Sequence, residues 1–219
     1  MVEVSSAQIA TNRAALYRWF ALAFFAPPTE NDVVDMRNGK LQQFLYALAN
    51  APGASLGVQA MGEALTSGTP AKVASELSAA HAKLFYGVGG YETASPYRSV
   101  YSSDHGVLCQ QATAEMERVL RQHRLRLQDT VREPADHLSI QLEVMAQLAL
   151  RYAEATQDDT DRQTRLQNEQ ADFLDKQLLS WLPAFSRRVA EVDDLGFHAG
   201  LASALQAVLE QDHAYLLEA

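Results

Sequence analysis

The chain of 219 residues has a single cysteine, Cys109, so it cannot form an internal disulfide bond. This cysteine content fits a reducing compartment. No basic residue lies close to Cys109 in the sequence to activate its thiol. We therefore interpret Cys109 as a small apolar residue buried near the start of a helix.

The sequence also lacks a hydrophobic run long enough to cross a bilayer. The stretch 41–62 carries no charged residue, but polar side chains, Pro52 and Gly53 interrupt it. The N-terminal pattern is not that of a signal peptide, because Glu3 precedes the first basic residue, Arg13, and no small-residue cleavage pattern follows an apolar core. We therefore expect a cytoplasmic protein with no stable membrane insertion.

Basic residues are scarce, with 18 Lys and Arg against 27 Asp and Glu and a net charge of −9. Nucleic-acid phosphates require a basic surface, so this balance disfavours nucleic acid as a partner. An acidic chain instead attracts cationic partners at long range. Hydrophobic residues make up 47% of the chain, enough for a sizeable core in one domain or two closely packed subdomains.

Sequence motifs of common enzymes are missing too. The run Gly87-Val88-Gly89-Gly90 has neither the spacing of a dinucleotide site nor the lysine of a P-loop. No zinc-binding His-Glu-x-x-His and no Gly-x-Ser-x-Gly elbow occur. The Asp-His pairs at 104–105, 136–137 and 212–213 are adjacent in sequence and diverge by about 100° on a helix. We therefore predict no catalytic residue and no metal site.

Apolar residues recur at three- to four-residue spacing along nearly the whole chain, which predicts an all-α fold. No alternating run of β-branched residues competes with this period, so we expect a helical bundle of roughly ten helices. Pro27-Pro28, Pro52-Gly53 and Pro183 are helix breaks, and Thr69-Pro70 is a cap and first helical position. The predicted helical stripes cover 9–24, 41–48, 56–65, 73–85, 108–127, 138–152, 166–181 and 201–216.

The segment 86–106 stands apart because it has four glycines and Pro96 but no helical period. A compact bundle rarely keeps ~20 structureless residues unless they bind a ligand or join two parts. We therefore divide the chain into an N-terminal helical half (1–90), a loop or hinge (91–107) and a C-terminal helical half (108–219). Together they are predicted to form one all-helical domain.

The first of two informative motifs, Pro96-Tyr97-Arg98-Ser99-Val100-Tyr101, lies in this hinge. Pro96 fixes its own φ and favours an extended conformation for the residue before it. Tyr97 and Tyr101 offer rigid apolar faces with a hydroxyl group at the tip, which suits a peptide-binding groove. The alternative is that both tyrosines only anchor the loop to the bundle.

The second motif is Glu133-Pro134-Ala135-Asp136-His137-Leu138, followed by Glu143-Val144-Met145. Pro134 suits the first turn of a helix, which places Glu133 and Asp136 near the helix N-terminus, where the macrodipole favours negative charge. In this interpretation they are capping residues. In the alternative, Asp136 and His137 lie at a groove edge and hold arginine side chains or backbone groups of a bound peptide.

Taken together, the two motifs resemble the TorD/DmsD/NarJ family, most of all its TorD branch. These proteins are redox-enzyme maturation chaperones for molybdenum-containing oxidoreductases of bacterial respiration. The aromatic first helix and the late pattern Phe173…Trp181-Leu182-Pro183 add to the resemblance. Many relatives have a His-Leu pair before the tryptophan, where this chain has Gln177-Leu178, so no role is carried over for that histidine.

The resemblance implies an all-helical cytoplasmic chaperone that is not an enzyme. Such proteins bind the twin-arginine leader and the apo form of a molybdoenzyme catalytic subunit, of the trimethylamine-N-oxide or dimethyl-sulfoxide reductase type. They delay export and assist insertion of the molybdopterin cofactor. The family's leader-binding residues carry over to positions in both motifs: Tyr97, Pro134, Asp136 and His137, with Ser99, Tyr101 and Glu133 as neighbours.

The resemblance implies no resident cofactor, although some relatives bind GTP weakly. Some relatives also exchange their halves across the connecting segment, so we expect a monomer or a half-exchanged homodimer. Two other hypotheses stay open. A helical GTP-binding hydrolase would use His137 and nearby carboxylates, and its turnover would disappear in a His137→Ala variant. An all-helical adaptor without leader specificity would bind any apolar basic peptide equally.

Overall fold

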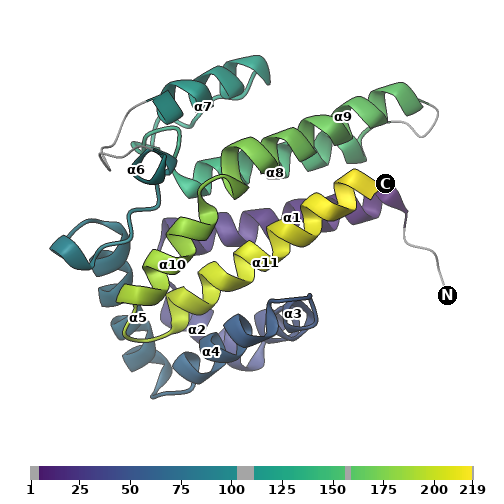
Figure 1. Cartoon of the computed structure of the whole chain (residues 1–219). Helices are drawn as coiled ribbons and strands as arrows, with labels where there is room; N and C mark the ends of the chain where they lie inside the picture. Colours follow the sequence, from purple (N-terminus) through teal and green to yellow (C-terminus); the bar gives the residue numbers. More distant parts are fainter. Residues whose placement is uncertain (1–4, 103–110, 156–158, 219) are drawn as a thin grey trace. The chain divides into compact units, whose positions relative to one another are not determined.

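The computed structural model describes residues 5–102, 111–155 and 159–218, and these ranges are all-α, as predicted (Figure 1). Outside the helices, one isolated antiparallel bridge joins Tyr97 to His137. Cys109 lies outside the described residues. The elements are α1 (Ser6–Phe25), α2 (Glu30–Asn38), α3 (Lys40–Ala49), α4 (Ser55–Leu65), α5 (Pro70–Phe85), the 3₁₀ turn η1 (Gly90–Glu92), α6 (Arg98–Tyr101), α7 (Gln111–Gln122), α8 (Leu138–Ala153), α9 (Thr160–Phe173), the π-helical segment η2 (Leu174–Leu179), α10 (Leu182–Val192) and α11 (Phe197–Glu218).

Helix boundaries follow local capping chemistry. Thr69 caps α5 by accepting the Lys72 N–H, and Pro70 is the first residue of that helix, as predicted. Helix α2 was not predicted, although its start carries a signal. Thr29 accepts the Asp32 N–H at 3.2 Å, and the Asp32 carboxylate accepts the Thr29 N–H at 2.8 Å, which is a capping box.

Two predicted helices differ from the observed ones. The stripe 108–127 was expected to be helical throughout, but α7 ends at Gln122 and Arg124 takes a left-handed conformation with φ of 53°. The beginning of that stripe lies outside the described residues. The stripe 166–181 is helical, but it changes from α9 to the wider π-helical turn of η2.

The chain forms two compact units, and each unit takes segments from both sides of the predicted hinge. The first unit comprises Met1–Phe25, Tyr97–Trp181 and His213–Ala219, and the second comprises Ala26–Pro96 and Leu182–Asp212. These units are therefore not the halves 1–90 and 108–219. The proposed exchange of those halves across 91–107 stays a prediction.

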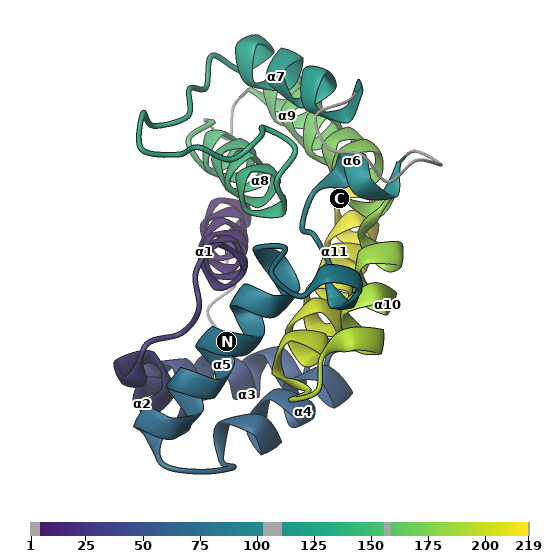
Figure 2. The same cartoon turned by 90° about the vertical axis from the view of Figure 1, so that its left-hand side faces the viewer.

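In the first unit, α1 packs along α8 (Figure 2). Helix α8 also contacts α9 and η2. Tyr17, Phe20 and Phe24 of α1 are buried, as are Leu142 and Met145 of α8. Each large apolar side chain that is buried contributes about 1.5–3 kcal/mol to stability. Helix α8 carries both motif residues and core residues, so this packing fixes the position of the second motif.

In the second unit, α2 contacts α3, α4 and α5. A Cβ atom added at Gly57 of α4 would lie 2.5 Å from the backbone oxygen of Gly200 in α11, so these helices cross with backbones in close approach. His81 and His198 are both fully buried, with ring centroids 5.7 Å apart. This unit holds no residue of either motif except Pro96.

Candidate functional site

The two sequence motifs meet in the first unit. The bridge between Tyr97 and His137 is joined by a hydrogen bond from the Arg98 N–H to the Asp136 carbonyl oxygen at 3.2 Å. The Tyr97 and His137 rings lie edge to face, with centroids 4.9 Å apart. The Tyr97 hydroxyl donates a hydrogen bond to the Glu133 carboxylate. The structure therefore brings Tyr97, Glu133, Asp136 and His137 together from distant parts of the sequence.

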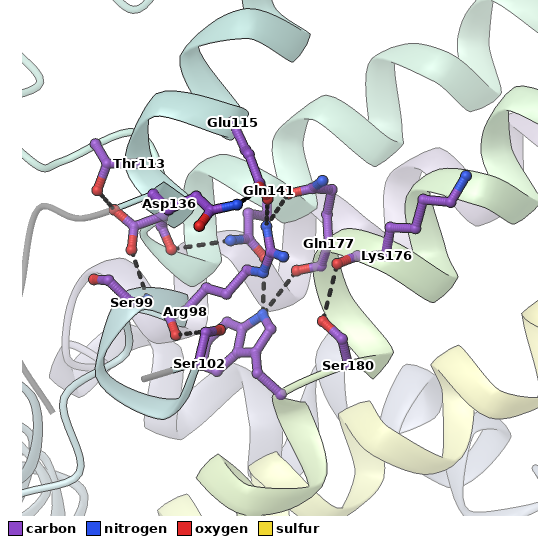
Figure 3. A network of polar contacts seen from close by, with 12 residues as sticks. Arg98, Ser99, Ser102, Thr113, Glu115, Asp136, Gln141, Lys176, Gln177 and Ser180 are labelled. Carbon is purple, nitrogen blue, oxygen red and sulfur yellow. Dashed lines mark hydrogen bonds and ion pairs between the residues drawn. The ribbon is translucent and has the colours of Figure 1, made fainter. Parts of the chain in front are cut away.

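Asp136 is fully buried, and both of its carboxylate oxygens accept hydrogen bonds from within the protein (Figure 3). Oδ2 accepts the Ser99 N–H at 2.9 Å, and Oδ1 accepts the Thr113 hydroxyl at 2.6 Å. Hydrogen bonds to a charged acceptor are stronger than neutral ones. The side chain thereby ties the first motif, α7 and the approach to α8 together. Thr113 was not predicted to belong to the site.

The backbone oxygen of Asp136 begins a second chain of hydrogen bonds (Figure 3). It accepts the Gln141 side-chain amide at 3.0 Å, and the Gln141 Oε1 accepts the Trp181 indole N–H at 3.2 Å. The same indole N–H also donates to the Gln177 backbone oxygen at 2.7 Å. Gln141 and Trp181 are almost fully buried, so these bonds satisfy groups that would otherwise be costly to bury.

Arg98 closes this network on the side of η2. Its Nη1 donates to the Gln177 Oε1 and to the Glu115 carboxylate, each at 2.8 Å. The pKa of Glu115 is lowered, first by the hydrogen bond from Gln111 and then by the Arg98 guanidinium. Gln177 therefore binds Arg98 through its side chain and Trp181 through its backbone oxygen.

His137 is the N-cap of α8, because its Nδ1 accepts the Ser139 N–H at 3.1 Å. Burial lowers the pKa of His137 to about 4, against the opposing effect of Glu133 and Asp136, so the ring is neutral near pH 7. The expected position of Pro134 in the first helical turn is wrong. The His137 N–H bonds to the Pro134 oxygen in a turn that precedes the helix.

The predicted site residues differ in what they expose to a ligand. Tyr97, Tyr101, Glu133 and Pro134 are partly exposed, whereas the other three, Ser99, Asp136 and His137, are buried. The Tyr101 ring stacks on the Trp181 ring, with centroids 5.6 Å apart. Tyr97 and Glu133, one residue from each motif, therefore present a partly exposed aromatic ring and a partly exposed carboxylate side by side to a ligand.

The described ranges contain neither a metal-binding cluster nor a membrane-spanning helix. In residues 5–102, 111–155 and 159–218, no group of three or more His, Cys, Asp or Glu side chains is placed to hold a metal ion. Among the described helices, none combines the length and the apolar character that crossing a bilayer requires.

Comparison with known proteins identifies the family. Residues 49–187 match the family model described as nitrate reductase delta subunit. The chaperone protein TorD of Vibrio cholerae serotype O1 is 33% identical over 202 residues, which cover 91% of this chain and 90% of that protein. The TorD chaperones of Vibrio parahaemolyticus and Vibrio vulnificus are 30% and 32% identical, each over 206 residues that cover 94% of both chains.

These matches agree with the prediction of a chaperone that is not an enzyme, and they give no support to the hydrolase hypothesis. They also confirm the resemblance that rested on the two motifs. The chain belongs to the TorD/DmsD/NarJ family of redox-enzyme maturation chaperones.

Proposed function

We propose that this protein is a cytoplasmic chaperone for a molybdoenzyme catalytic subunit of the trimethylamine-N-oxide or dimethyl-sulfoxide reductase type. It binds the twin-arginine leader and the apo form of its client, assists insertion of the molybdopterin cofactor and delays export until then. The observation that carries the proposal is the similarity to proteins named chaperone TorD over 94% of the chain.

The mechanism is recognition without a chemical step. Tyr97 and Glu133 are partly exposed, so a leader arginine can reach the Glu133 carboxylate while an apolar group lies on the Tyr97 ring. The hydroxyl of Tyr97 donates to the same carboxylate and helps to orient it. Asp136 acts as a positioning residue, because its oxygens are engaged with Ser99 and Thr113.

The net charge of −9 favours encounter with a basic leader at low ionic strength. Calorimetric titration with twin-arginine leader peptides from the organism's molybdoenzymes tests the proposal, with an arginine-to-lysine peptide as the control for each. We expect one leader to bind with a Kd on the order of micromolar or tighter, and its lysine control to bind more weakly because lysine lacks the guanidinium fork. Equal binding of both peptides would favour an adaptor without leader specificity.

The proposal includes no resident cofactor, and any weak GTP binding is separate from leader recognition. His137 uses Nδ1 as a helix cap, so we expect no GTP turnover in the wild-type protein. Turnover that disappears in a folded His137→Ala variant would instead favour the hydrolase. Light scattering after size exclusion would separate the proposed monomer from a half-exchanged dimer.

A further inference from the structure

A groove with a mainly apolar lining lies between α1, α8 and the segment that follows α7. It has a volume of about 610 Å³, and α1 contributes Leu22 and Phe25, α8 contributes Ile140 and Val144, and the connecting segment contributes Leu127. The Leu22 side chain is 69% exposed and that of Phe25 is 41% exposed. Large apolar side chains at this exposure, beside a groove of this size, are typical of a surface that binds a partner.

A second depression, of about 490 Å³, adjoins the first and has a different chemistry. Its charged lining residues are Glu117, Glu133 and Arg132. The Glu117 carboxylate also pairs with the Arg121 guanidinium at 3.7 Å on α7, and both side chains are more than half exposed, so a bound arginine can compete for this carboxylate. Leu120 and Leu127 line both depressions, so these two leucines form a shared wall. The acidic depression and the apolar groove are therefore neighbouring parts of one surface.

Both depressions border the cluster formed by the two sequence motifs. Phe25 lines the apolar groove, and its ring lies edge to face with the His137 ring at a centroid distance of 6.2 Å. Glu133 lines the acidic depression and accepts the Tyr97 hydroxyl. The surface therefore includes both residues of the two motifs, such as Glu133, and residues outside them, such as Phe25.

The remaining charges of the apolar groove set its polarity. Arg18 and Glu143 form an ion pair at 3.2 Å, and Glu143 also accepts the Gln147 side-chain amide. Arg126 is the other charged group in the lining. Because Arg126 adds a positive charge to an otherwise paired rim, an arginine of a bound segment is favoured in the acidic depression and disfavoured in the apolar groove.

We propose that the acidic depression and the apolar groove form one bipartite site, with the client's leader as its occupant. The leader's arginines bind Glu117 and Glu133, and the apolar stretch that adjoins them packs on Leu22 and Phe25. This assignment rests on the proposed function and specifies the residues that carry it. It adds Leu22, Phe25 and Glu117, which lie outside both sequence motifs.

The apolar half is tested by calorimetry with Leu22→Asp, and Leu217→Asp is the matched control because Leu217 is 68% exposed on α11, outside the groove. We expect Leu22→Asp to weaken binding of the full leader by about tenfold or more, and the control to stay within about twofold. A leader peptide that ends before its apolar stretch should bind the wild type and Leu22→Asp equally.

The acidic half is tested with the double variant Glu117→Gln/Glu133→Gln and with Glu210→Gln, which changes an exposed glutamate on α11. In the double variant, the Kd values of the arginine leader and its lysine control should differ by less than about threefold. In the Glu210→Gln protein, they should differ as much as in the wild type. Circular dichroism confirms that each variant is folded.

The outcomes separate the bipartite site from the proposed function. If the wild type binds a leader and the Leu22→Asp and double variants bind it as the wild type does, the bipartite site is overturned and the chaperone function stands. If the folded wild type binds no leader, the proposed function fails and this site fails with it.

Discussion

Replacing Asp136 with alanine should destabilise the first unit much more than an ordinary surface substitution. The carboxylate is fully buried and accepts hydrogen bonds from the Ser99 N–H and the Thr113 hydroxyl. A hydrogen bond to a charged group contributes about 1.5–3 kcal/mol, so the loss of two predicts a cost of roughly 3–6 kcal/mol. This is a large fraction of the 5–15 kcal/mol by which a typical domain is stable, as an order of magnitude.

Asparagine at the same position should cost less, because it keeps the shape of the side chain. Its amide oxygen can still accept the Ser99 N–H, and its NH₂ group can donate to the Thr113 hydroxyl, which both donates and accepts. We expect Asp136→Asn to cost about 1–3 kcal/mol. Asp172→Ala is the control, since Asp172 is 69% exposed and forms an exposed pair with Lys176 four residues further on, so about 0.5 kcal/mol or less is expected.

Urea unfolding followed by tryptophan fluorescence suits this measurement, because both tryptophans of the chain, Trp19 and Trp181, belong to the first unit. The urea concentration at the unfolding midpoint should be highest for Asp172→Ala, lower for Asp136→Asn and lowest for Asp136→Ala. The slope of the unfolding free energy against urea concentration should be the same for all three. If the Asp136→Ala protein folds and its free energy of unfolding falls by less than about 1 kcal/mol, Asp136 does not stabilise the first unit as its hydrogen bonds indicate.

Three further predictions concern stability. Gly57→Ala should cost roughly 1–3 kcal/mol in thermal or urea unfolding followed by circular dichroism, because its Cβ would meet the Gly200 oxygen; a neutral effect would contradict the close helix crossing. Burial lowers the pKa values of His137 and His198 to about 4. The free energy of unfolding should therefore be greatest above pH 6.5 and fall towards pH 4, because these histidines take up protons in the unfolded chain first. The loss should be on the order of 3 kcal/mol for each histidine. Replacing His198 with leucine should make the free energy of unfolding depend less on pH. An unchanged pH dependence would contradict the contribution of His198. Gln141→Leu should cost about 0.5–1.5 kcal/mol in urea unfolding, because the Asp136 carbonyl oxygen keeps the Arg98 N–H but loses the Gln141 amide. A cost within experimental error would contradict a stabilising role for this hydrogen bond.

Helix type and approximate extent were predictable because apolar periodicity, proline and glycine act locally. The Thr69-Pro70 start is an example, since the cap and the proline are adjacent in sequence. Helix α2 was missed because it is short and buries only Val33 and Met36, which give too few repeats to reveal a period. The capping box of Thr29 and Asp32 was the available signal.

The sequence motifs named the residues, and the structure shows which of them lie together. Tyr97, Glu133, Asp136 and His137 are neighbours, and their part in leader binding stays a prediction. However, the burial of Asp136 depends on partners 37 and 23 residues away, and local sequence carries no information on such pairings. The placement of Pro134 failed for a related reason, because the turn before α8 is held by the bridge to Tyr97.

The second motif holds two carboxylates three residues apart, at Glu133 and Asp136, and the structure gives them opposite environments. Asp136 faces inward and fixes the position of the first motif, whereas Glu133 is partly exposed at the edge of an acidic depression. The proposed function therefore assigns arginine recognition to Glu133, while the structure assigns a stabilising role to Asp136. A change at Asp136 should therefore alter unfolding first and binding only as a consequence. A change at Glu133 should alter arginine recognition while the fold stays intact. This difference distinguishes a residue that stabilises the site from one that contacts the ligand.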